Sequence, residues 1–178
     1  VGDIEGLPFL EAIRQVKKHV GRNDCLYIHV TLVPFVTGAG ELKTKPTQHS
    51  VKELRSLGIQ PDILICRSAQ PIPQDMCEKM AMFCDVDADA VFQNLTARSI
   101  YEVPVLLEKQ GLDEVVLRKL DVDVTNHPLN MDEWHDMVER MLKEYDRKVT
   151  LGVVGKYVEL QDSYISLTEA LRHAAMAN

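Results

Sequence analysis

The chain has 178 residues, of which 46% are hydrophobic and 26% charged, a balance typical of a globular chain with room for one domain or parts of two. Its formal net charge of −7 argues against nonspecific binding to nucleic acids or to an anionic membrane surface. No stretch approaches the ~18 apolar residues of a transmembrane helix, and no signal peptide is evident. We therefore expect neither a membrane nor a nucleic acid among its partners.

The first predicted helix follows Pro8, a favourable first-turn residue, and ends at Gly21. Its apolar positions share one face: Phe9, Ile13, Val16 and Val20. Acidic residues precede the helix or lie on its first two turns: Asp3, Glu5 and Glu11. Favourable electrostatics at a helix N-terminus account for such acids. The alternative is that the acids accept hydrogen bonds from ribose hydroxyls or from an exocyclic amine.

A strand over 25–33 is followed by a polar turn over 40–50 and then by a helix over 48–57, with Thr47 as its predicted N-terminal cap. Parallel α/β sheets bind ligands where the carboxyl end of a strand faces a helix N-terminus. The turn holds lysines and hydroxyl groups, and these suit a polyphosphate when they lie beside unpaired helix N–H groups. The alternative is a solvated loop that caps an ordinary helix.

The apolar run over 63–66 predicts a strand covered on both faces, and it ends at the polar pair Arg67-Ser68. The next helix is introduced by Pro71 and Pro73. Its predicted buried stripe comprises Met76, Cys77, Met80, Phe83 and Cys84. Lys79 lies at the edge of this stripe, where its ammonium can reach a neighbouring site or simply water.

A third strand over 90–92 is followed by a polar turn at 93–94 and by helices over 99–110 and 112–120, which Gly111 separates. Helices and strands therefore alternate along this part of the chain. Such alternation predicts an α/β fold with a doubly wound parallel sheet. The four cysteines form no CxxC pair, as expected for buried thiols of a reducing, cytoplasmic compartment: Cys25, Cys66, Cys77 and Cys84.

Residues 121–130 read as a linker, and an amphipathic helix over 131–145 is predicted to pack across a domain boundary through Trp134, Met137, Val138, Met141 and Tyr145. A new first strand is predicted over 149–155, with Asp162 capping a helix over 163–175. This second unit is too short to bury its own core. Because the chain starts at Val1 without a methionine and stops inside a helical pattern, we expect it to be a piece of a longer protein.

The sequence has no GxxxxGK[ST] phosphate loop, no zinc-ligand spacing, no GxSxG elbow and no glycine-rich dinucleotide fingerprint. Residue chemistry alone therefore predicts an α/β domain with an anion or nucleotide site near Lys43 and Lys45. Five blocks, in their order and spacing, resemble the CTP synthase family of glutamine-dependent enzymes that aminate UTP. They read GDIE at 2–5, GELKTKPTQHSV at 40–51, GIQPDILICR at 58–67, SIYEVP at 99–104 and GVVGKY at 152–157.

The resemblance implies an amidoligase domain related to dethiobiotin synthetase, followed by a class I glutamine amidotransferase domain. Residues 1–121 would be the back part of the amidoligase, 122–147 the linker and helix between domains, and 148–178 the start of the glutaminase. In the family, ATP phosphorylates the 4-oxygen of UTP, and ammonia from glutamine displaces the phosphate to give CTP. Mg²⁺ accompanies ATP, GTP activates, and homotetramers that can form filaments build the pyrimidine nucleotide site at their interfaces.

The resemblance also assigns residues. By motif match, the triphosphate of UTP or CTP would be held by Lys43, Thr44, Lys45, Pro46, Thr47, Gln48 and Lys79. The nucleoside part of CTP would face Asp3, Ile4, Glu5 and Glu11. Where the family often has a charged pair beside the adenine of ATP, this chain has Leu95, Thr96 and Ala97, so backbone contacts are expected there, with Arg67 nearby.

The family's phosphate loop and magnesium-binding acids would lie before Val1, and its glutaminase Cys, His and Glu after Asn178. The chain is therefore expected to hold no catalytic and no metal-binding residue and to be inactive alone. Two readings stay open: a segment of an enzyme, or a nucleotide-binding and tetramer-assembly module without catalysis.

Overall fold

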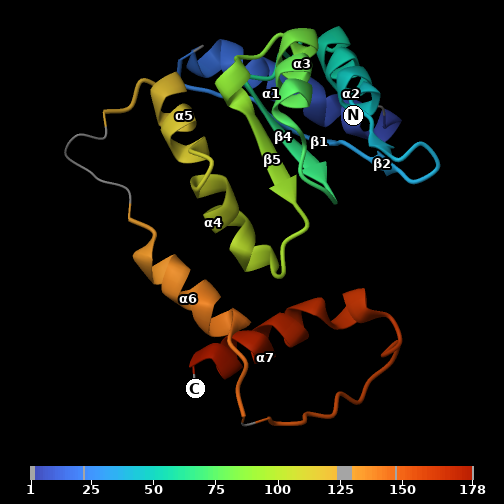
Figure 1. Ribbon diagram of the computed structural model, residues 1–178, viewed down its shortest axis with the longest axis vertical. Helices are drawn as coiled ribbons and strands as arrows, with labels where there is room; N and C mark the ends of the chain where they lie inside the picture. Colours follow the sequence, from blue (N-terminus) through green and yellow to red (C-terminus); the bar gives the residue numbers. More distant parts are fainter. Residues whose placement is uncertain (1–2, 22, 124–129, 147, 178) are drawn as a thin grey trace. The chain divides into compact units, whose positions relative to one another are not determined.

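The computed structural model describes residues 3–21, 23–123, 130–146 and 148–177 (Figure 1). The chain divides into a first unit over residues 1–129 and a second over 130–178. Among the described residues, no helix combines the length and the apolar character needed to cross a membrane. Part of the predicted linker, residues 124–129, lies outside the described residues.

A parallel three-stranded sheet forms the centre of the first unit, with the order β1-β4-β5 (Figure 1). The strands are β1 (Ile28–Leu32), β4 (Ile63–Ser68) and β5 (Val91–Leu95). β4 pairs with β1 on one side and with β5 on the other. Residues 63–66 of β4 are all buried, which confirms the strand predicted from the continuous apolar run.

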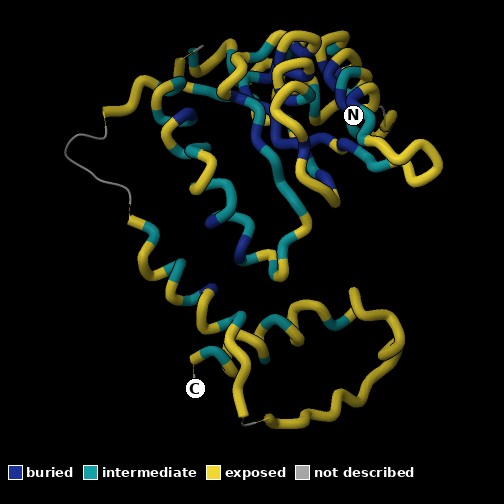
Figure 2. The backbone as a smooth tube through the Cα atoms, in the orientation of Figure 1, coloured by how far each residue is buried: buried dark blue, intermediate teal, exposed yellow. Residues whose placement is uncertain are grey.

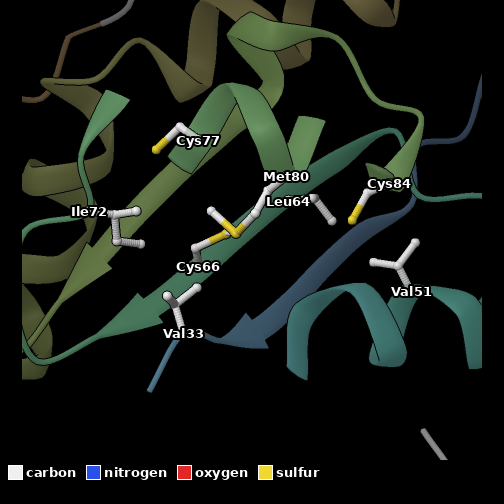
Figure 3. Close-up of a cluster of buried hydrophobic side chains, with 8 residues drawn as sticks. All are labelled: Val33, Val51, Leu64, Cys66, Ile72, Cys77, Met80 and Cys84. Carbon is white, nitrogen blue, oxygen red and sulfur yellow. Dashed lines mark hydrogen bonds between the residues drawn. The ribbon is translucent and has the colours of Figure 1, made fainter. Parts of the chain in front are cut away.

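One face of the sheet is covered by α2 (Lys45–Ser56) and α3 (Gln74–Cys84). Figure 3 shows the core between them and β4, where the sulfur atoms of Cys66 and Met80 lie 4.0 Å apart. Burial raises the pKa of the Cys66 thiol to about 12 and that of Cys84 to about 11. These thiols are therefore protonated and inert at neutral pH. The cluster comprises Val33, Val51, Leu64, Cys66, Ile72, Cys77, Met80 and Cys84.

The opposite face is covered by α4 (Val103–Glu108) and α5 (Leu112–Lys119), with short turns η2 (Ala88–Ala90) and η3 (Ile100–Glu102) beside them. Its core comprises Ile63, Ile65, Ala90, Phe92 and Val115. Gly111 precedes α5 with a φ of 78°, a conformation that glycine adopts without strain. Helices on both faces of a parallel sheet confirm the predicted α/β fold.

The turn η1 (Ile4–Gly6) leads into α1 (Leu7–Val20), which confirms the first predicted helix. Its apolar face, however, buries no residue completely, and the exposed fractions of Phe9 and Val16 are 72% and 46%. The edge strand β1 is similar, since Val30 and Leu32 are also exposed. The apolar pattern predicted the helix correctly, but a core against this face is not formed by the described residues.

Four features of the first unit differ from prediction. The polar turn contains a small antiparallel hairpin of β2 (Phe35–Val36) and β3 (Glu41–Leu42). Helix α2 begins at Lys45 after Thr44, so the prediction of Thr47 as the cap is wrong. Strand β5 continues through the predicted turn at 93–94, because these residues pair with β4 and the side-chain amide of Gln110 bonds to both backbone groups of Gln93. Phe83 is 53% exposed and lines a hollow between α2 and α3, so it does not belong to the buried stripe.

The second unit contains α6 (Asp132–Leu142), the turn η4 (Gln161–Tyr164) and α7 (Ile165–Ala177). The strand predicted over 149–155 is not formed, and Figure 2 shows this segment exposed throughout. A strand needs a neighbouring strand for its backbone hydrogen bonds, and the described residues of this unit provide none. Asp162 lies inside η4, so it does not cap α7 as predicted. Helix α6 ends at 142, three residues before the predicted end.

We expect Met80→Ala to lower the free energy of unfolding of the chain by about 2–5 kcal/mol, because it leaves a cavity in a closed core. Met80 has no exposed surface. Met82 on the same helix is 71% exposed, so the same change there is a matched control with an expected effect within ~0.5 kcal/mol. Urea unfolding followed by circular dichroism measures both. Equal losses would contradict the packing of α3 against the sheet.

Candidate functional site

A cavity of about 430 Å³ lies at the carboxyl end of the sheet. It is lined by Val30, Thr31 and Leu32 of β1, by Pro46 and Ser50 of α2, and by Arg67 of β4. Ligands of parallel α/β sheets bind at this end, outside the strands and next to a helix N-terminus. The structure thus brings one residue of the predicted triphosphate block, Pro46, together with one predicted ATP-adjacent residue, Arg67.

The first turn of α2 is fixed to the end of β1 by buried hydroxyl groups. Thr47 has no exposed surface, and its Oγ1 donates to the carbonyl oxygen of Leu32 at 3.1 Å. Thr47 Oγ1 also accepts from Thr31 Oγ1 at 3.2 Å. Thr47 therefore uses its hydroxyl inside the protein. Its contribution to a ligand would be the backbone N–H of a first helical turn, which has no partner within a helix.

The remaining residues of the block surround this helix start. Thr44 is buried before the first turn, and Gln48 Nε2 donates to its Oγ1 at 3.2 Å. Lys45 is exposed at the first helical position. The block therefore presents a helix N-terminus and a cation at one place. Lys79 is exposed on α3 and is not among the residues that line the 430 Å³ cavity.

Lys43, directly after β3, forms an ion pair through its Nζ with the carboxylate of Glu41 at the start of the same strand. This contact lowers the pKa of Glu41 below its usual value. Both side chains are substantially exposed, at 43% for Lys43 and 58% for Glu41, so solvent screens the attraction. A phosphate group carries more charge than a carboxylate and can replace Glu41 as the partner of Lys43.

The predicted nucleoside-facing acids occupy η1 and α1 and differ in their partners. Asp3 caps η1 by accepting from the backbone N–H of Glu5 at 3.1 Å. Glu11 accepts from Arg14 at 2.6 and 2.8 Å, and these bonds with Gln15 lower its pKa to about 2. Within the described residues, the carboxylate of Glu5 has no hydrogen-bond or ion-pair partner. Ile4 between them is 82% exposed.

Arg67 connects the ends of β4 and β5. Its Nη1 donates to the backbone oxygens of Asn94 and Leu95, each at 3.0 Å. The predicted ATP-adjacent residues Arg67 and Leu95 are therefore in direct contact, and Thr96 and Ala97 follow Leu95 at the end of the strand. Part of the Arg67 guanidinium is bonded to the backbone of Asn94 and Leu95. Arg67 therefore holds the end of β5 in place and also lines the cavity.

Sequence reasoning did not single out three polar residues near the cavity. Thr31 and Ser50 line it, and His29 Nε2 lies 2.8 Å from Ser50 Oγ. Burial lowers the pKa of His29 below its usual value, so its ring is neutral at pH 7. The signal was present, because Ser50 lies one helical turn after Pro46 and His29 and Thr31 interrupt an apolar run. Among the described residues, no group of three or more His, Cys, Asp or Glu side chains is arranged to hold a metal ion.

The sequence is similar to known proteins over its whole length. A sequence model described as CTP synthase N-terminus matches residues 1–122. The chain is 59% identical over 178 residues to the CTP synthase of Methanocaldococcus jannaschii, and the match covers 100% of this chain and 32% of that protein. It is 57% identical over 176 residues to the CTP synthase of Moorella thermoacetica, covering 99% and 32%.

The CTP synthase of Bacillus pumilus is 54% identical over 177 residues, with 99% of this chain and 32% of the relative covered. The chain thus spans about a third of the length of the curated relatives it matches. A match to the family over residues 1–122, together with these identities, shows that the chain belongs to the CTP synthase family.

Proposed function

We propose that this chain is the segment of a CTP synthase that binds the triphosphate of UTP, the substrate, and of CTP, the inhibitor. The whole protein would aminate UTP to CTP with ATP and with ammonia from glutamine. The observation that carries the proposal is the start of α2 beside the 430 Å³ cavity, where Lys45 and Pro46 begin the helix. Cations and unpaired N–H groups at one helix start favour a polyphosphate.

In this proposal the triphosphate residues divide by role. Lys43 and Lys45 supply the charge, and Thr44, Thr47 and Gln48 hold the helix start in place through their hydrogen bonds with each other and with β1. Lys79 would approach from α3. Glu5 would accept from the nucleoside, since it is exposed and its carboxylate has no partner among the described residues. Asp3 and Glu11 would support it from η1 and α1.

ATP would lie near Arg67 and the segment Leu95–Thr96–Ala97, contacted mainly by backbone groups. The described residues do not provide a ligand set that fits the Mg²⁺ accompanying ATP. Because the chain spans about a third of the length of its curated relatives, we propose that it is inactive alone and serves catalysis as a part of the longer protein.

We further propose the finer division of the family's domains for this chain. Residues 1–121 would be the back part of a dethiobiotin-synthetase-like amidoligase, 122–147 the linker and helix, and 148–178 the start of a class I glutamine amidotransferase. The family match, which ends at residue 122, lies close to the first of these boundaries. The protein would be a cytoplasmic homotetramer, able to form filaments and activated by GTP.

The alternative function is a nucleotide-binding and tetramer-assembly module without catalysis. The apolar surface left exposed on α1 and β1 favours assembly of some kind. Gel filtration of the chain with and without CTP distinguishes this alternative, because a module that assembles around the nucleotide elutes earlier when CTP is present.

The first test is synthesis of CTP. A full-length protein that carries this sequence is expected to make CTP from UTP, ATP and glutamine, whereas the purified 178-residue chain makes none even when ammonia is supplied. The reason is that the chain spans about a third of the length of the curated relatives it matches, so it would carry only part of the catalytic machinery. Chromatographic detection of CTP measures both. Product from the 178-residue chain alone would contradict the proposal.

The second test concerns the lysines. In the full-length protein, Lys43→Ala and Lys45→Ala should each lower the affinity for UTP and for CTP about ten- to a hundredfold, because both nucleotides present the same three phosphates to these charges. ATP affinity should change much less. Lys52→Ala, on the exposed side of the same helix beyond the first turn, is the matched control. If ATP binding falls as steeply as UTP binding, the lysines belong to a different site.

The third test separates the nucleoside end from the triphosphate end. Glu5→Ala is expected to raise the CTP concentration for half-inhibition about tenfold, with a much smaller change in KM for UTP. A carboxylate can accept from the 4-amino group that CTP has and UTP lacks. If Glu5 only complements a helix dipole, its loss should lower the melting temperature and leave inhibition unchanged. Inhibition curves and thermal melting of the same variant decide between these accounts.

A further inference from the structure

Helix α1 is attached to the first unit mainly by polar contacts. None of its residues is fully buried, and its apolar face is largely exposed. By contrast, α2 and α3 each place several residues in the core. Among the described residues, the contacts that hold α1 against the sheet are therefore a small number of hydrogen bonds and ion pairs.

These contacts come from two residues at the amino end of the sheet. Tyr27 precedes β1, and its Oη donates to the carbonyl oxygen of Ile13 in α1 at 2.8 Å. Asp62 precedes β4, and its Oδ2 accepts from Lys17 Nζ of α1 at 2.8 Å. The same Oδ2 accepts from the backbone N–H of Tyr27 at 2.8 Å, and Lys17 Nζ lies 4.7 Å from the centre of the Tyr27 ring. We name Lys17, Tyr27 and Asp62 the α1 clamp.

A glycine completes the attachment. Gly58 has a φ of +82°, and a Cβ at this position would lie 2.9 Å from Cδ of Arg14. The absence of a side chain therefore lets Arg14 lie directly on the loop before β4. Arg14 also forms the ion pair with Glu11 on the preceding turn of α1. The contacts at the amino end of the sheet thus continue to one of the acids that the proposed function assigns to CTP.

The clamp residues, with Arg14 and Gly58, line a cavity of about 750 Å³. Two of the cations that line it are already neutralised, Arg14 by Glu11 and Lys17 by Asp62. Lys17 and Asp62 are also only 21% and 26% exposed, so water screens their attraction less than it screens a surface pair. This arrangement fits a junction that holds a helix better than it fits a site for an anion.

We propose that the α1 clamp positions α1 for feedback inhibition, so that Tyr27 and Asp62 are positioning residues for CTP although neither would touch the nucleotide. This inference rests on the proposed function, in which Glu5 and Glu11 face the nucleoside. A carboxylate recognises a 4-amino group or a ribose hydroxyl only within hydrogen-bond distance. A small displacement of α1 would therefore weaken the binding of CTP. The triphosphate residues are fixed separately, through Thr47 and the end of β1.

The experiment uses the full-length protein with Tyr27→Phe and Asp62→Asn. The first removes only the hydroxyl that bonds to Ile13, and the second removes the charge that pairs with Lys17 while keeping the shape. Each should raise the CTP concentration for half-inhibition about three- to tenfold, and change KM for UTP and kcat less than about twofold. Amide hydrogen exchange should become faster over residues 7–20 in both variants.

Asp87→Asn is the matched control. Asp87 pairs with Lys119 at 2.5 Å, so the same chemical change removes another Lys–Asp ion pair that does not contact α1. It should alter neither CTP inhibition nor hydrogen exchange in α1.

Faster exchange with unchanged inhibition would overturn the proposal, because the clamp would then stabilise α1 without any effect on CTP. Unchanged exchange in both variants would overturn the clamp itself. A wild-type protein that makes no CTP would instead contradict the proposed function. In that case the hydrogen-exchange measurement would still test whether the α1 clamp holds α1 in place.

Discussion

Burial of β4 on both faces is the constraint on which the first unit depends. A strand whose residues 63–66 are all buried requires apolar cover above and below, and helices α2 and α3 supply it on one side while α4 and α5 supply it on the other. Parallel pairing of β1 and β5 with β4 then places three carboxyl ends at one edge. Arg67, near the end of β4, is where this strand first becomes polar, and it meets the start of α2 there.

Polar contacts fix the two ends of this unit in different ways. At the carboxyl end, Thr47 is fully buried and its hydroxyl is paired on both sides, so leaving either group unpaired would carry a desolvation cost of ~1–3 kcal/mol. At the amino end, Lys17 and Asp62 form a charge-assisted contact at 2.8 Å that is only partly open to water. The start of α2 is thus held by buried neutral hydroxyl groups, and α1 is held by a partly buried ion pair.

The sequence patterns predicted what periodicity and backbone chemistry determine locally. The buried strand over 63–66, the helix from Pro8 to Gly21 and the break at Gly111 all follow from such signals, and the structure confirms them.

Other features depend on contacts between residues that are distant in sequence. Phe83 fits the apolar stripe of α3, but the neighbouring α2 leaves it in an open hollow. Thr47 is a good capping residue by type, but its hydroxyl is used by Leu32, fifteen residues earlier. The contacts of His29 and Ser50 could be known only once β1 and α2 were adjacent.

Local cations explain how a chain with a net negative charge could offer the proposed site for an anion. With a formal charge of −7, the long-range field disfavours a triphosphate, so the site depends on charges within one Debye length. Lys43 is held by Glu41 when no ligand competes, which keeps the cation ordered near the hairpin and close to the helix start. A triphosphate would replace one carboxylate with several phosphate oxygens and would add the N–H groups of the first turn. Binding would then be an exchange of anionic partners, in which only the difference between phosphate and carboxylate contributes to affinity. The proposed site would discriminate by the number of phosphates a nucleotide carries, and it would leave the choice between bases to the exposed acids of η1 and α1.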